Sequence, residues 1–135
     1  MMTKVSLTGE IEAGRVSEQP MMGADLLPTI AAMMGASKPE EVKWDGTNLL
    51  PHWKKSTALK ERDLFWEFKK HLAMRRGNFK LVTHKDGKSP ELYDLNNDLG
   101  ESKNLAKEKP QLTEEMLQAV QAWYAEITAG VEKRT

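Results

Sequence analysis

The sequence predicts an α+β domain, in which a small four-stranded antiparallel sheet packs with a C-terminal helix and is preceded by a short helix. Three observations carry this prediction. Four short runs rich in aromatic and aliphatic residues lie between residues 64 and 95, turn residues separate them, and apolar residues recur every three or four positions after Pro110. A sheet and a helix that each have one apolar face can bury those faces against each other.

Residues 1–61 are expected to form a lead-in, one short helix and a connector. Glycines and Pro20 punctuate residues 1–23, which show no sustained period, so we expect an extended segment with one short strand near Arg15 and Val16. Asp25 is expected to cap the N-terminus of the helix and Gly35 to end it. The stripe of this helix would consist of Leu26, Leu27, Ile30, Ala31, Met33 and Met34.

Residues 36–61 combine prolines, a glycine and many charges, which predicts an irregular connector. Its one apolar patch comprises Leu49, Leu50 and Trp53. We place the domain boundary at its end, which gives segments 1–61 and 62–135.

The four strands of the second segment are predicted at residues 64–68, 72–76, 79–84 and 91–95. Gly77-Asn78 is typical of a two-residue hairpin turn, and Asp86-Gly87 offers a second turn. Alternation places Phe79, Leu81 and Thr83 on one face of the sheet, opposite Lys80, Val82 and His84. A helix should start at Pro110 and end near Gly130, with an apolar stripe of Leu112, Met116, Val120, Trp123 and Ile127.

The composition fits one soluble globular domain of 135 residues, with 39% hydrophobic and 30% charged residues. No apolar run approaches the roughly 20 residues of a membrane span, so we expect no membrane partner. The N-terminus has no signal-peptide pattern, and the cellular location is left undetermined. Without cysteine, the chain has no disulfide, thiolate metal ligand or cysteine nucleophile.

The net charge of zero hides a segregation along the chain. Residues 1–53 carry 4 basic and 7 acidic groups, residues 54–88 carry 11 and 4, and residues 89–135 carry 5 and 9. The acidic ends would neutralise the basic middle by folding against it. Alternatively, the middle forms an electropositive surface that attracts an anionic ligand.

Most motif classes are missing from the sequence. The histidines, His52, His71 and His84, have no metal-ligand spacing, so we expect no metal site. The adjacent pairs Glu40-Glu41 and Glu114-Glu115 are expected to be solvated rather than catalytic. No P-loop, dinucleotide-binding or nucleophile-elbow pattern is present.

One cluster has a chemical meaning, because its cations are interleaved with aromatic residues. Aromatic rings stack on sugars or bases, while cations bind sulfate or phosphate. Alternation turns Arg75 and Arg76 to opposite faces of the sheet, so the cations do not form one stripe. This favours a structural interpretation, with the aromatic residues in the core and the cations at the rim. The alternatives are a surface that binds an anionic saccharide and a surface that binds nucleic acid. The cluster comprises Lys69, Lys70, Arg75, Arg76 and Lys80 with Phe65, Trp66, Phe68 and Phe79.

The order of several landmarks resembles the C-terminal portion of formylglycine-dependent sulfatases. The landmarks run from Glu12 to about Trp123 and arrive in the family's order: Glu12 to Ser17, Asp25-Leu26-Leu27-Pro28-Thr29, Asp45-Gly46 to Pro51, Arg62 to Glu67, Ala73-Met74-Arg75 with Gly77 to Leu81, and Glu91 to Leu95 followed by Asn104-Leu105-Ala106. Asn78-Phe79 replaces the family's Asp-Trp, Leu99 replaces a proline, and Phe68 replaces a histidine.

The resemblance implies that the nucleophile and metal lie elsewhere. Family members use a formylglycine made within a Cys/Ser-X-Pro-Ser-Arg motif, and a calcium ion held by the large domain; no serine here begins that motif. We therefore expect no catalytic residue, metal or cofactor in this chain, which alone should be inactive. Full-length members are often periplasmic, secreted or lysosomal.

The resulting hypothesis is a sulfatase fragment that supports the fold and the edge of the substrate cleft, with a missing large domain as its partner. Weak candidates for contact with a sulfated substrate are Glu67, Lys69, His71 and Arg75. The alternative is a free-standing module that binds sulfated glycan or, less expected, nucleic acid, or that self-associates through apolar surfaces around Leu26, Ile30, Leu49 and Trp53.

Overall fold

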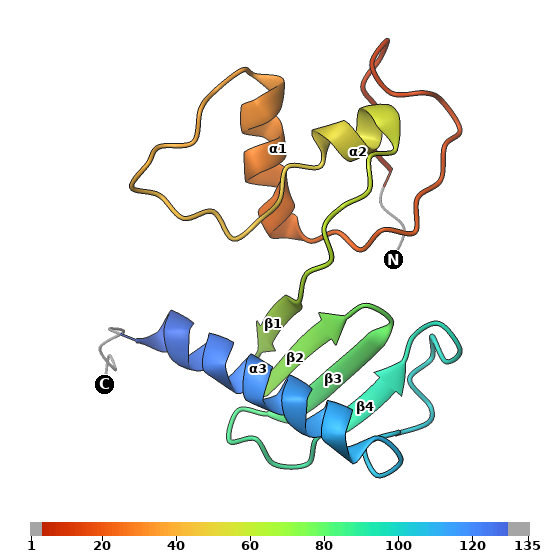
Figure 1. The fold of residues 1–135 in the computed structure, drawn as a ribbon, viewed down its shortest axis with the longest axis vertical. Helices are drawn as coiled ribbons and strands as arrows, with labels where there is room; N and C mark the ends of the chain where they lie inside the picture. The colour runs from red at the N-terminus through yellow and green to blue at the C-terminus, as the bar shows by residue number, and fades with distance from the viewer. Residues whose placement is uncertain (1–3, 130–135) are drawn as a thin grey trace. The chain divides into compact units, whose positions relative to one another are not determined.

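The structure is a computed structural model that describes residues 4–129 (Figure 1). Its contacts divide the chain into two compact units, Met1–Lys60 and Glu61–Thr135. The boundary expected from the sequence lies one residue later. Each unit has buried side chains of its own.

The second unit contains the predicted antiparallel sheet. Its strands are β1 (Leu64–Phe68), β2 (His71–Arg76), β3 (Phe79–His84) and β4 (Glu91–Asp94), in the order β1-β2-β3-β4. Neighbours in the chain are therefore neighbours in the sheet, which is a simple meander (Figure 1). The sequence prediction of four strands is confirmed, with ends that differ by one residue in β2 and β4.

The two hairpin turns of two residues, between β1 and β2 and between β2 and β3, each contain one residue with positive φ. Gly77 has φ 54° between the paired residues Arg76 and Phe79. Asn78 has no positive φ, so the turn has the type II′ pattern rather than type I′. The turn between β1 and β2 places Lys69 at φ 55°, where glycine is usual.

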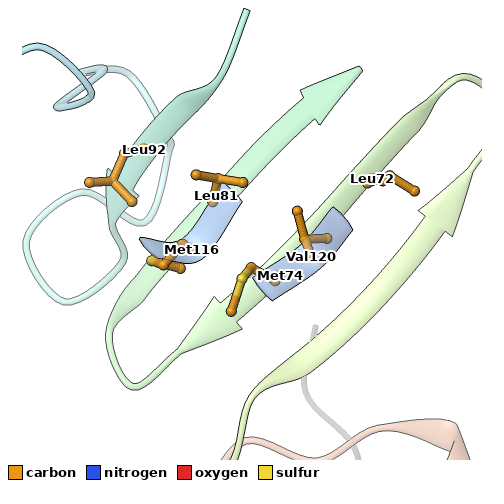
Figure 2. Close-up of a cluster of buried hydrophobic side chains, with 6 residues drawn as sticks. All are labelled: Leu72, Met74, Leu81, Leu92, Met116 and Val120. Carbon is orange, nitrogen blue, oxygen red and sulfur yellow. The ribbon is translucent and has the colours of Figure 1, made fainter. Parts of the chain in front are cut away.

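Helix α3 (Pro110–Thr128) covers one face of this sheet (Figure 1). Proline occupies its first turn, as predicted, because a missing N–H costs nothing there. The predicted stop at Gly130 lies outside the described residues. Figure 2 shows the core that results, in which α3 places Met116 and Val120 over side chains of β2, β3 and β4: Leu72, Met74, Leu81 and Leu92.

The alternation predicted for β3 is confirmed. Leu81 and Thr83 are buried beneath α3, whereas His84 is exposed on the other face. Phe65 of β1 stacks on Trp123 of α3, with ring centroids 5.2 Å apart and planes 9° from parallel. Phe65 and Glu67 therefore belong to the α3 face of the sheet.

The first unit contains the predicted short helix, α1 (Leu26–Met33), directly after a turn of 3-10 helix, η1 (Gly23–Asp25). Gly35 ends it with φ 67°, and Gly35 and Ala36 donate their N–H groups to the carbonyls of Ala32 and Ala31. This is the Schellman arrangement, which satisfies two carbonyls at the end of a helix.

The prediction that Asp25 caps the N-terminus of α1 is wrong in its geometry. Asp25 itself has helical φ and ψ, and its carboxylate accepts the N–H of Met22, at 2.9 Å, and of Thr47, at 2.8 Å. The helical backbone thus starts earlier than expected. The fully buried carboxylate links the helix start to a loop distant in sequence.

The loop can approach α1 because residue 46 is glycine. A Cβ atom at this position would lie 2.0 Å from the carbonyl oxygen of Ala24, which no other residue type tolerates. In the same contact, the Thr29 hydroxyl accepts a hydrogen bond from the N–H of Leu49 at 2.9 Å, and Leu49 is buried. Close packing of the loop against the backbone of Ala24 therefore explains why glycine occupies position 46 in the Asp45-Gly46 landmark.

The predicted irregular connector holds a second helix, α2 (Leu50–Lys55), so the prediction is wrong for this stretch. Pro51 lies in its first turn, and Ser56 ends it with a left-handed backbone. The short strand expected near Arg15 and Val16 is also not formed. Instead, the guanidinium of Arg15 donates to the carbonyls of His52 and Trp53 and to the Ser56 hydroxyl, and so caps the C-terminal end of α2.

Candidate functional site

The four predicted substrate-contact residues lie on or near the β1–β2 hairpin, but in different environments. Glu67 lies on the α3 face of the sheet, where it forms an ion pair with Lys85. The Nζ atom of Lys85 is also 5.2 Å from the ring centroid of Tyr124 on α3. The pKa of Lys85 is raised, chiefly by its hydrogen bond to Glu67. Glu67 is thus engaged in holding the sheet to the helix.

Lys69 occupies the turn rather than either face. Its Nζ atom lies 5.2 Å from the centroid of the Phe68 ring, which is 70% exposed. A cation over an exposed aromatic ring contributes little to stability but orients the side chain.

His71 and Arg75 lie on the face of the sheet opposite α3. His71 is directly across from His84 on β3, with ring centroids 4.6 Å apart. Arg75 donates its Nε–H to the Gly77 carbonyl at 2.8 Å. Four residues along a strand separate His71 from Arg75 by roughly 13 Å, so the structure does not bring the four candidates into one cluster.

This second face carries four members of the predicted cluster, Trp66, Phe68, Arg75 and Lys80. Trp66 is 39% exposed beside Phe68, and Tyr93 donates its hydroxyl to Glu91 at 3.0 Å. Burial is the main cause that raises the pKa of Tyr93, with the Glu91 hydrogen bond second. Arg75 and Arg76 face opposite sides of the sheet, as predicted. Arg76 lies on the α3 face, where Asp63 binds its guanidinium and Glu115 of α3 is near.

Carboxylates neutralise several cations of the basic middle segment. Two of these partners come from the acidic ends: Glu101 binds Lys80 at 2.6 Å, and Glu10 pairs with Lys54. The others come from within the segment, where Asp63, Glu67 and Asp86 pair with Arg76, Lys85 and Lys88. The hydrogen bond to Asp63 is also the main cause that raises the pKa of Arg76. These pairs do not favour one broad electropositive surface.

A shallow pocket of about 480 Å³ lies at the start of α3, away from the predicted residues. Its lining includes Phe79, Lys109, Leu112 and Glu115, and the Lys109 ammonium lies 5.6 Å from the Phe79 ring centroid. None of the four candidates contributes to it. The pocket has no buried polar group that would orient a ligand.

Sequence reasoning missed a polar cluster in the first unit. His52 is buried, and its Nδ1 and Nε2 atoms lie 2.8 Å from the Thr57 carbonyl and the Ser17 hydroxyl. Because a carbonyl only accepts, we assign a ring proton to Nδ1; in that tautomer Ser17 donates its hydroxyl to Nε2. No spacing in the sequence indicates this contact, which joins residues 35 positions apart.

Within residues 4–129, no group of three or more His, Cys, Asp or Glu side chains is placed to hold a metal ion. Across the same range, no helix has the length and apolarity that crossing a bilayer requires.

The fold is similar to parts of several solved structures, some of which are described as sulfatases. The chain matches the crystal structure of Ps i-CgsB with 25% identity and a TM-score of 0.71, covering 86% of this chain and 27% of that one. Ps i-CgsB has also been solved in complex with k-i-k-neocarrahexaose. A putative sulfatase, yidJ from Bacteroides fragilis, matches with 28% identity and a TM-score of 0.62, covering 78% of this chain and 24% of that one.

The chain belongs to the family described as N-sulphoglucosamine sulphohydrolase, C-terminal, whose model matches residues 1–126. A curated relative, a sulfatase of Formosa agariphila, is 29% identical over 103 residues, which cover 64% of this chain. The match covers only 19% of that relative's length. The resemblance inferred from the ordered landmarks is therefore confirmed for the C-terminal portion of a sulfatase.

Proposed function

We propose that this chain is the C-terminal part of a sulfuric ester hydrolase, which supports a large catalytic domain and forms an edge of its substrate cleft. The observation that carries the proposal is the family match over residues 1–126, combined with the small share of the sulfatase relative that the chain covers. The activity itself would reside in the paired assembly rather than in this chain.

The chemistry needed for ester hydrolysis supports this division. Transfer of a sulfuryl group requires a nucleophile and positive charges placed in advance around the developing negative charge. The sequence has no cysteine and no Ser-X-Pro-Ser-Arg motif, and the described residues contain no group of three or more His, Cys, Asp or Glu side chains placed to hold a metal ion. We therefore expect both the nucleophile and the calcium ligands to come from sequence outside this chain.

Helix α1 offers a surface for the large domain. The residues that α1 buries are Pro28 and Thr29, whereas four larger apolar side chains are 42–59% exposed, namely Leu26, Leu27, Ile30 and Met33. Contiguous exposed apolar surface of this kind marks an interaction site. We assign it to contact with the large domain.

The test begins with the coding DNA upstream of residue 1. We expect a reading frame there that contains a Cys/Ser-X-Pro-Ser-Arg motif. The two parts, expressed together with a formylglycine-generating enzyme, should co-purify and release sulfate from 4-nitrophenyl sulfate. This chain alone should not. Hydrolysis by this chain alone, or an upstream part that is equally active without it, would contradict the proposal.

A contribution to the substrate edge can be tested separately in the same assembly. Arg75 is the best candidate, because its guanidinium is oriented by Gly77 on the face that also carries the exposed Trp66. We expect Arg75→Gln to raise KM for a sulfated oligosaccharide severalfold, and to leave KM for 4-nitrophenyl sulfate unchanged. An equal effect on both substrates would indicate a structural role instead.

A further inference from the structure

Two exposed histidines lie side by side on the second face of the sheet. His71 is the first residue of β2, and His84, the last residue of β3, lies directly opposite it. Their ring centroids are 4.6 Å apart and their planes are inclined by 47°. They are thirteen positions apart in the sequence, so only the strand register brings them together.

The register also fixes the type of pairing. Counting from the two-residue turn at Gly77-Asn78, alternate pairs exchange backbone hydrogen bonds, and His71 and His84 form a pair that does not. The N–H of His84 accordingly points away from β2 and donates to the Lys88 carbonyl at 3.2 Å. Side chains approach most closely in such pairs, which suits two imidazoles that share one ligand.

Imidazole nitrogen is a common ligand of zinc, copper and nickel ions, whereas calcium and magnesium prefer oxygen. Two imidazoles supply half of a tetrahedral shell, and water would complete it, because no third protein ligand is in place among residues 4–129. The site would therefore bind its ion weakly and exchange it readily.

The turn after His84 carries an acidic and a basic side chain. Asp86 follows His84 by two residues and binds the Lys88 ammonium at 3.0 Å. Lys85 is held by Glu67 on the other face of the sheet.

We propose that His71 and His84 form a two-imidazole site for a divalent transition-metal ion of the zinc, copper or nickel type. The site is separate from the calcium chemistry of sulfatases and does not rest on the proposed function. Since the two ligands meet only when β2 and β3 are paired, the ion binds the folded chain and stabilises it.

The test uses the full chain of 135 residues without a polyhistidine tag. Thermal unfolding followed by circular dichroism should show a rise in Tm of about 5 °C with about 1 mM zinc, and none with magnesium. His71→Asn and His84→Asn should each abolish the rise. Val82→Thr, on the same face of β3, should keep it.

Nuclear magnetic resonance provides a readout that needs no variant. Substoichiometric copper should broaden the ring signals of His71 and His84 and leave those of His52, which is buried in the other unit, unchanged. The proposal is overturned if no transition-metal ion shifts Tm, if the shift survives both asparagine substitutions, or if His52 broadens in place of the pair.

Discussion

Lys69 occupies a backbone conformation that lysine seldom adopts. At φ 55° its Cβ atom crowds the following carbonyl, a cost of about 1–2 kcal/mol that glycine avoids. The neighbouring Lys70 has no positive φ and accepts the N–H of Lys85 on its carbonyl at 2.9 Å. The two lysines of one turn therefore differ in strain.

Replacing Lys69 by glycine should stabilise the second unit by about 0.5–1 kcal/mol, because the strain is relieved and the exposed contact with Phe68 contributes little. Urea unfolding followed by tryptophan fluorescence measures the change. The matched control is Lys70→Gly, which should be neutral or destabilising. Equal destabilisation by both substitutions would show that Lys69 is not strained.

Asp98 organises the loop after β4 through three hydrogen bonds. Its carboxylate accepts the backbone N–H groups of Lys103 and Ser102 and the Ser102 hydroxyl, at 2.8–2.9 Å. The backbone hydrogen bond from Lys103 is the largest of the causes that lower its pKa below the usual 3.8. A carboxylate with a lowered pKa stabilises the fold only while it is ionised.

We therefore expect the stabilisation by Asp98 to be complete above about pH 4 and to disappear as the pH falls through its folded pKa. The stability difference between the wild type and Asp98→Asn, measured by urea unfolding from about pH 7 to pH 2.5, should shrink over this window. Glu114→Gln, on the exposed side of α3, controls for the loss of one charge. A difference that is the same at every pH would contradict the interpretation.

The hydrogen-bond and ring partners of some single residues could not be predicted from the sequence. Asp25 before an apolar stripe has the pattern of an N-cap, yet its carboxylate binds Thr47, 22 positions away. Local pattern contains no information about such a partner. The pairing of His71 with His84 could not be predicted from local pattern either, because it depends on the register of two strands.

At the scale of elements, α3 and the sheet were predictable because each repeats its pattern over many residues. The stripe of α3 places Met116 and Val120 in the core, whereas Ile127, the last member of the predicted stripe, is 43% exposed. Helix α2 was missed because its 6 residues are too few to establish a period, and because the contacts that hold its C-terminal end come from Arg15. Short elements depend on distant partners more than on their own sequence.

Met116→Ala should destabilise the second unit by about 2–4 kcal/mol, because the side chain is fully buried between α3 and the sheet and its loss leaves a cavity. Ile127→Ala on the same helix should cost less than about 1 kcal/mol. Chemical denaturation of both variants compares them directly. Similar losses would mean that α3 packs along its whole length rather than around Met116.

At the scale of the whole molecule, the exposed stripe of α1 has a consequence for the chain in isolation. Without a large domain to cover them, the side chains of Leu26, Leu27 and Ile30 remain 50–59% exposed to water. Apolar surfaces of this kind associate with one another.

We expect the isolated chain to self-associate at high concentration, and the double substitution Leu26→Glu and Ile30→Glu to shift it toward monomer. Light scattering measures the mass in both cases. Leu99→Glu, which alters an 83% exposed leucine outside the stripe, should change nothing. A strictly monomeric wild-type chain would exclude association through α1.

The order β1-β2-β3-β4 also determines how the second unit can form. Every strand pairs with the one made just before it, so each pairing closes a loop of only two to six residues. Such short closures cost little chain entropy and occur within microseconds, and α3 then completes the core from the adjacent sequence. A chain with this contact pattern needs no distant segment to begin folding, and we expect the second unit to assemble rapidly as soon as its last helix has been synthesised.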